Sequence, residues 1–143
     1  MMMAMPSQPR SSRRRFPAAF ALAALAFLAL DSLWLTVMAT RLYRPLIGDL
    51  MRADFDPLAA AAFYALYIAG MVSFVVLPAT RVRDAAARGA LFGLVAYATY
   101  DLTNQATMRG WPWSLTLADL CWGMFATCCA CAFAKWALAA LRR

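Results

Sequence analysis

The sequence predicts an all-α protein, a four-helix transmembrane bundle with both termini on the cytoplasmic side (N-in/C-in). Of its 143 residues, 64% are hydrophobic and the mean hydropathy is +0.61, whereas a soluble globular domain is roughly half apolar. About 20 apolar residues cross the roughly 30 Å of hydrocarbon in a bilayer as a helix. Four segments are long enough to do so: residues 16–39, 57–78, 85–108 and 114–136.

The first span follows a polar, arginine-rich segment. Residues 1–15 are rich in Ser, Pro and Arg, so we expect a disordered basic tail, followed by one four-helix transmembrane domain over residues 16–143. An acidic residue, Asp31, stands inside the first apolar run, and three more spans follow it. We therefore interpret the first span as a retained helix and not as a cleaved signal. Tyr43, in the loop that comes next, is expected in the membrane interface.

The next two spans have clear local signals. Asp56 and Pro57 predict the start of the second helix, with Asp56 as N-cap and Pro57 at the first helical position. A short loop makes the second and third helices antiparallel neighbours. The fourth span follows a tight turn around Gly110. Three tryptophans near span ends are expected in the interfacial belts: Trp111, Trp113 and Trp136.

The basic residues indicate the orientation, because cytoplasmic loops carry an excess of Lys and Arg. The net charge is +7, but the basic residues cluster at the ends of apolar runs, so nucleic acid is not an expected partner. We expect a bacterial inner-membrane protein with both termini cytoplasmic and membrane lipids as its surroundings. Ten basic residues fall on the predicted inner side (Arg10, Arg13, Arg14, Arg15, Arg81, Arg83, Arg88, Lys135, Arg142, Arg143) and four on the outer side (Arg41, Arg44, Arg52, Arg109).

The four cysteines and the absence of histidine bear on metal chemistry. Cys128, Cys129 and Cys131 lie close together in the last span, and Cys121 lies further up it. Adjacent residues of a helix point to different faces. We interpret the cysteines as small apolar packing residues and expect no metal site and no cofactor.

Three aspartates are the acidic residues inside the spans: Asp31, Asp101 and Asp119. An acidic or basic side chain at the centre of a bilayer costs roughly 2.5–3.5 kcal/mol on insertion scales, so it persists where it is compensated or where function requires it. Counted from the outer boundary at about 1.5 Å per residue, all three fall at about one level in the outer half. Burial and mutual repulsion predict that at least one stays protonated unless Arg41, Arg44, Arg109 or a bound cation compensates it.

Spacing adds polar and aromatic neighbours to these aspartates. Gly89, Gly93, Tyr97, Asp101 and Asn104 share one face of the third helix. The glycines allow close helix approach, and the outer end of this face is polar. We expect a pocket in the outer half, with Asp31, Asp101 and Asp119 as its catalytic candidates. Its predicted ligand-binding residues are Asp31, Trp34, Tyr64, Tyr67, Tyr97, Tyr100, Asp101, Asn104, Asp119 and Trp122.

A purely structural role for the aspartates stays open, in which protonated carboxyls bond to neighbouring helices. Interhelical hydrogen bonds in membranes average about 0.6 kcal/mol, so a neutral side chain would serve as well.

Several short motifs stand along the chain: Asp31-Ser-Leu-Trp34-Leu35, Tyr43, Phe63-Tyr64, Tyr97-Ala-Thr-Tyr100-Asp101-Leu-Thr-Asn104, Ala106-Thr107, Gly110-Trp111-Pro112 and Asp119-Leu-Cys-Trp122-Gly123. Together they resemble the DUF2177 family of small bacterial membrane proteins. The resemblance covers about residues 16–135 and implies a four-helix membrane architecture but no reaction. The arginine-rich N-terminus and the cysteine cluster depart from the family pattern.

The preferred function is binding of a lipid-like or small cationic ligand in this acidic, aromatic pocket. Three alternatives stay open: a membrane-embedded acid–base enzyme acting on a lipid, a small proton- or cation-coupled transporter subunit, and a non-catalytic assembly or stress protein. The transporter reading requires a homo-oligomer, because four short helices barely enclose a pathway. Whether the chain is an enzyme is undecided from sequence, since no nucleophilic Ser/His pair or phosphate-binding glycine loop occurs.

Overall fold

The computed structural model describes residues 10–141, and the side chains from residue 15 onward. Of the predicted tail 1–15, the first nine residues lie outside the described residues, and the first helix begins at Arg10. The elements in chain order are α1 (Arg10–Met38), η1 (Ala39–Tyr43), α2 (Arg44–Ile47), η2 (Gly48–Leu50), α3 (Pro57–Gly70), η3 (Met71–Val76), α4 (Val82–Thr107) and α5 (Trp113–Ala140).

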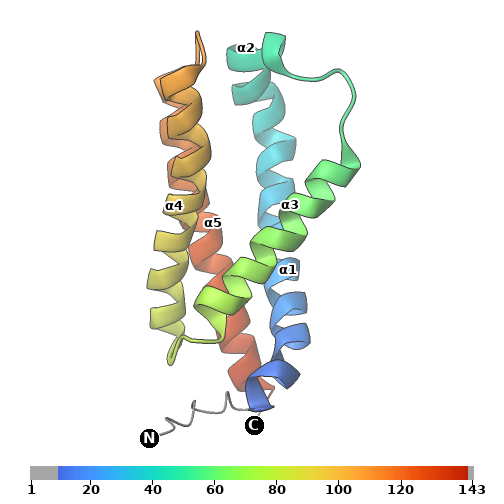
Figure 1. Cartoon of the computed structure of the whole chain (residues 1–143), viewed down its shortest axis with the longest axis vertical. Coiled ribbons are helices and arrows are strands. Elements are labelled where there is room, and N and C mark those ends of the chain that lie inside the picture. Colours follow the sequence, from blue (N-terminus) through green and yellow to red (C-terminus); the bar gives the residue numbers. More distant parts are fainter. Residues whose placement is uncertain (1–9, 142–143) are drawn as a thin grey trace, which may run out of the picture.

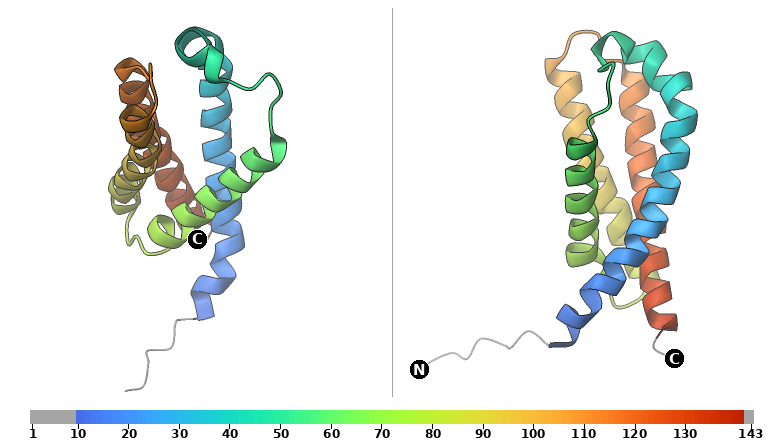
Figure 2. Two further views of the ribbon diagram at one scale, coloured as in Figure 1. Left: turned by 45° about the horizontal axis from the view of Figure 1, so that its top comes forward. Right: turned by 90° about the vertical axis from the view of Figure 1, so that its right-hand side faces the viewer.

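Four long helical segments form the bundle, which confirms the predicted all-α class; between residues 10 and 141 the structure has no strand. α1 rises along the bundle, α3 and η3 descend, α4 rises and α5 descends (Figure 1). The start of α1 and the end of α5 therefore lie at one end of the molecule, and the α4–α5 turn lies at the other. α3 crosses the bundle obliquely, and its Pro57 end lies away from α4 (Figures 1 and 2).

Three helical stretches are long and apolar enough to cross a membrane: Arg15–Leu50, Pro57–Val76 and Trp113–Ala140. α4 is long enough, but its sequence is more polar. Its exposed threonines bond to their own helix, as Thr99 Oγ1 does to the carbonyl of Val95 (2.7 Å) and Thr107 Oγ1 to that of Thr103 (2.7 Å). Hydroxyls paired in this way need no water, which lowers the cost of placing α4 in lipid.

The start of α3 follows the predicted signal. The Asp56 carboxylate accepts hydrogen bonds from the backbone N–H groups of Leu58 (3.1 Å) and Ala59 (3.0 Å). These groups have no partner inside the helix, so Asp56 is the predicted N-cap, and Pro57 occupies the first helical position. The prediction for this helix start is confirmed.

Glycines allow α4 and α5 to approach each other closely. A Cβ atom on Gly93 would overlap the backbone carbonyl of Gly123, and one on Gly89 would lie 2.9 Å from the Cβ of Cys131. Gly123 in turn faces the ring of Tyr97. Close backbone approach through small residues is a common way for helices to associate in lipid, where water does not drive them together. This α4–α5 contact sets the spacing of two of the three aspartates.

The core fills the lower part of the bundle, toward the end where the chain begins and ends. Its fully buried members include Phe27 of α1, Met71 and Val72 of η3, and Ala130 of α5. Lys135 of α5 donates to the carbonyl of Val76 (3.1 Å), at the end of η3. The upper part packs less closely, and the aspartates lie there.

Candidate intramembrane binding site

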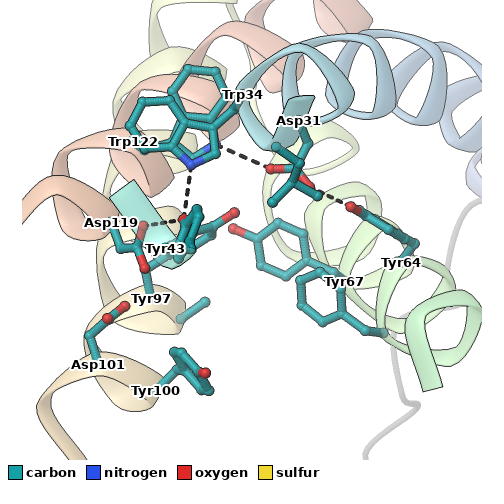
Figure 3. A pocket seen from close by; sticks show the side chains of 13 residues that line it. Asp31, Trp34, Tyr43, Tyr64, Tyr67, Tyr97, Tyr100, Asp101, Asp119 and Trp122 are labelled. Carbon is teal, nitrogen blue, oxygen red and sulfur yellow. Dashed lines mark hydrogen bonds between the residues drawn. The ribbon is translucent and has the colours of Figure 1, made fainter. Parts of the chain in front are cut away.

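A cavity of about 480 Å³ lies between the helices, above the core. Its volume falls within the roughly 300–1,000 Å³ of small-ligand pockets. Nine of the ten residues predicted for the site line it, and Asn104 is not among them. The lining residues are Asp31, Trp34, Leu35, Tyr43, Phe63, Tyr64, Tyr67, Ala96, Tyr97, Tyr100, Asp101, Asp119 and Trp122, and Figure 3 shows most of their side chains turned toward one another.

Asp31 of α1 is held from two other helices. Tyr64 of α3 donates its hydroxyl to one carboxyl oxygen, and the indole N–H of Trp122, on α5, donates to the other (3.2 Å). The residue is 6% exposed. Because each oxygen has a donor, Asp31 is satisfied by the protein alone and also ties three helices together (Figure 3).

Asp119 of α5 accepts a hydrogen bond from the hydroxyl of Tyr43, which lies in η1 at the end of the first helix. Tyr43 in turn accepts the indole N–H of Trp34 (2.9 Å). The rings of Trp34 and Trp122 are stacked, with centroids 4.5 Å apart and planes 9° from parallel. The hydrogen bonds thus cross between α1 and α5, since Trp122 bonds to Asp31 and Trp34 leads through Tyr43 to Asp119.

Asp101 of α4 differs from the other two aspartates. Its side chain is fully buried, and neither carboxyl oxygen has a hydrogen-bond partner among the described residues. Its acidic neighbour is Asp119, close enough for the two carboxyls to share a hydrogen bond when one of them carries a proton. Two ionised carboxylates have no proton to share, so the pair needs either one proton or a donor from elsewhere. Within residues 15–141, no arginine or lysine forms an ion pair with any of the three aspartates.

The three aspartates line one cavity but do not form a single cluster. Trp34 and Trp122 follow Asp31 and Asp119 by three residues each, on helices that run in opposite directions. The two rings nevertheless stack, because a helical side chain leans toward the N-terminus of its helix, so each ring lies back toward the level of its own aspartate. The site therefore holds a pair, Asp101 and Asp119, and a separate carboxylate, Asp31. Accordingly, no group of three or more Asp, Glu, Cys or His side chains in the described part of the chain could hold a metal ion.

Tyr43 is the functional candidate that the spacing argument missed. In a regular α-helix, residues nine apart point in roughly opposite directions at about 100° per residue, so Tyr43 and Trp34 should not meet. Between them lies η1, a π-helical turn closed by the N–H of Arg44 bonding to the carbonyl of Ala39. A π-turn takes in an extra residue, changes the register and is frequent at functional sites. The family motifs, which include Tyr43, carried the signal that helical spacing lacked.

A second polar cluster lies beside the α4–α5 turn and corrects another expectation. Trp111 is 6% exposed, so it is not a belt residue. Its indole N–H donates to Thr116 Oγ1 (3.1 Å), which donates to Gln105 Oε1 (3.0 Å), and the Gln105 amide donates to the carbonyl of Trp111 (2.9 Å). This closed Gln105–Trp111–Thr116 ring needs no outside partner.

The carboxyl pair can act in two ways. Together the two groups can accept hydrogen bonds from a cation or from a neutral donor. They also have unlike surroundings, because Asp119 accepts a tyrosine hydroxyl and Asp101 accepts nothing. Neighbouring carboxyls in unlike surroundings take different protonation states, as in acid–base catalysis.

Residues 16–136 match a family model described as predicted membrane protein, DUF2177. No curated protein and no solved structure matches the chain. The matched range covers most of the sequence and agrees with the extent of the resemblance that the motifs indicated. Its description fits a bundle with three membrane-spanning candidates. The chain belongs to the DUF2177 family of predicted membrane proteins.

Proposed function

We propose that this protein binds a small cationic or lipid-like ligand in the cavity between its helices, with the Asp101–Asp119 pair as the acceptor for the ligand's polar group. The observation that carries the proposal is Asp101, whose two buried carboxyl oxygens receive no hydrogen bond from a backbone group or a neutral side chain of the described chain; only the neighbouring Asp119 carboxyl, if protonated, could donate to it. Leaving a buried polar group unpaired costs about 1–3 kcal/mol, and more if it is charged. Such a cost is expected where function requires the group, as at an intramembrane binding site.

The remaining lining residues suit this role. Asp31 and Asp119 are held by protein donors, so they fix the walls of the cavity, while Asp101 is free to accept. Tyr67, which donates to or accepts from Thr127 (2.8 Å), and Tyr97 supply aromatic surface. Aromatic faces attract cations as well as apolar groups. The ten residues predicted from sequence, less Asn104, are the proposed site.

The test is a titration of the purified protein with butylamine, followed by the fluorescence of its tryptophans, of which Trp34 and Trp122 line the cavity. We expect saturable binding to the wild-type chain and a loss of at least about tenfold in affinity for Asp101→Asn, because a neutral amide replaces the charged acceptor. Asp49→Asn, a change in an exposed aspartate of η2, is the matched control. Unsaturable binding, or equal binding to both variants, would refute the proposal.

The same pair supports a second candidate, an acid–base enzyme acting on a lipid. The unlike surroundings of Asp101 and Asp119 favour it. Vesicles of bacterial lipid extract containing wild-type protein would be compared by mass spectrometry with vesicles containing Asp101→Asn. A lipid species converted in the first and not in the second would support catalysis, and identical lipid profiles would argue against it.

We further propose that the chain lies in a bacterial inner membrane with four crossings and both termini cytoplasmic. α3 and α5 both descend through the bundle, so if both cross, α4 must cross between them. Fusing alkaline phosphatase, which is active outside the cytoplasm, to the C-terminus tests the orientation. We expect no phosphatase activity there and activity for a fusion in the loop before Asp56. A homo-oligomer stays a prediction.

A further inference from the structure

We propose that the ligand is an amphiphile with an ammonium head group and a hydrocarbon chain, and that the hydrocarbon chain lies in a second cavity that adjoins the first. This inference rests on the proposed function, because the head group occupies the same Asp101–Asp119 site. What it adds is the chemical class of the ligand and the path of its apolar part.

The second cavity has a volume of about 470 Å³ and lies between α3, η3 and α4. Its walls are almost entirely apolar, with Phe63, Leu66, Phe74 and Phe92 among them. Phe63 and Tyr67 line both cavities, so the two spaces adjoin across these rings. One space ends in a carboxyl pair and the other is apolar, which together is the polarity pattern of an amphiphile.

The apolar cavity opens to the surface that faces lipid. Leu66 and Phe74 on its rim are 78% and 70% exposed. α4 packs on α5 along its length but contacts the α3 segment mainly through η3, so the upper part of α3 leaves a lateral opening. The hydrocarbon chain of a ligand can enter from the bilayer through this opening without crossing water.

Two local features keep this cavity open. Gly70 has no Cβ, and one placed there would come within 3.0 Å of the Phe92 ring. Ala69, also on the wall, fills little space.

At the polar end, the carboxyl pair has no basic partner among the described side chains. A single positive charge that donates hydrogen bonds is the complement of this pair, and such charge-assisted bonds are stronger than neutral ones.

The head group and the hydrocarbon chain of the ligand contribute differently to binding, because the surrounding solvent is lipid. Lipid tails are as apolar as the cavity, so burying the chain gains little hydrophobic free energy, and the gain comes from packing. The head group therefore supplies most of the affinity, and the apolar cavity selects and orients the chain.

The test uses three probes in detergent solution, measured by native mass spectrometry: hexadecylamine, butylamine and hexadecanol. Ala69→Trp fills the apolar cavity and leaves the carboxyl pair unchanged. Ala65→Trp, one turn away on an exposed face of α3 that lines neither cavity, is the matched control. Circular dichroism and a single elution peak confirm that both variants fold.

We expect Ala69→Trp to weaken hexadecylamine binding about tenfold, as lost packing of a chain in a preformed cavity predicts, and to leave butylamine binding unchanged. Ala65→Trp should change neither. If Ala69→Trp leaves hexadecylamine unaffected, the chain does not lie in the second cavity, although the proposed function stands as long as butylamine binding depends on Asp101. If hexadecanol binds as tightly as hexadecylamine, the ammonium assignment is wrong. If butylamine does not bind at all, the proposed function itself fails.

Discussion

Two polar clusters lie between α4 and α5, toward the turn that joins them, and their buried polar groups find partners to different degrees. In the Gln105–Trp111–Thr116 ring, three hydrogen bonds satisfy one another. One turn earlier on α4, Asp101 is equally buried and has no partner in the described chain. We therefore expect the ring to stabilise the fold and the unpaired Asp101 carboxyl to destabilise it. The fold satisfies the polar groups of the ring by itself. The Asp101 carboxyl, in contrast, lies where we propose that a ligand supplies the missing partner.

The largest expected change in the free energy of unfolding comes from breaking the Gln105–Trp111–Thr116 ring. Thr116→Val leaves the buried indole N–H of Trp111 without its acceptor and the half-buried amide oxygen of Gln105 without its donor. We expect the free energy of unfolding to fall by about 2 kcal/mol, measured by SDS titration in mixed micelles. Thr103→Val is the control, because that exposed hydroxyl bonds only to carbonyls of its own helix. A ring variant as stable as the control would show that the ring does not stabilise the fold.

The second largest effect is expected when Asp119 loses its hydrogen-bond donor and so resembles Asp101. Tyr43→Phe removes the hydroxyl that donates to Asp119 and accepts from Trp34. We expect a loss of about 1.5 kcal/mol in unfolding free energy, because the bond involves a charged acceptor but is only partly buried. The same titration measures it, and near-ultraviolet circular dichroism reports the stacked Trp34–Trp122 pair. Unchanged stability would mean that Asp119 needs no donor, which weakens the contrast.

Substituting Asp101 should raise the free energy of unfolding, whereas the two changes above should lower it. Asp101→Asn replaces a buried carboxyl by an amide that can donate to Asp119, so the free energy of unfolding should rise by about 1 kcal/mol while butylamine binding is lost. Stability gained at the expense of function is common where a functional site is strained. If the variant is less stable, Asp101 has a structural role, and the comparison between the two clusters fails.

The smallest effect concerns Asp84, a carboxylate at the other end of α4 that lies near water. The hydroxyl of Thr80 (2.5 Å), then the N–H of Arg81 and the neighbouring arginines, lower the pKa of Asp84, with partial burial acting the other way. A lowered pKa gives stability that is present above the unfolded value of about 3.9 and lost as the pH falls through the folded value.

Thr80→Val should therefore move the Asp84 titration toward higher pH. The carbon-13 shift of the Asp84 carboxyl, followed between neutral and acid pH, measures it. An unmoved midpoint would assign the lowered pKa to the arginines instead.

The sequence predicted the helices better than the contacts between them. Apolar length, the Asp56–Pro57 signal and the family motifs depend on local chemistry. The last two were confirmed, and apolar length was confirmed for three of the four predicted spans. The stacking of Trp34 on Trp122 depends on how α1 and α5 are shifted along each other, which counting from loop ends does not measure. The burial of Trp111 depends on Gln105 and Thr116 meeting it across the turn. Tyr43 was missed because a π-turn alters the helical register, and no residue pattern in this chain announces one.

The contact between Gly93 and Gly123 has a consequence for the chemistry above it. Asp101 lies two turns beyond Gly93 on α4, and Asp119 lies one turn before Gly123 on α5. The missing Cβ atoms at these two glycines therefore set how closely the two carboxyls approach each other. A Cβ atom added at Gly93 would push α4 away from α5 and so separate the carboxyls without touching either of them.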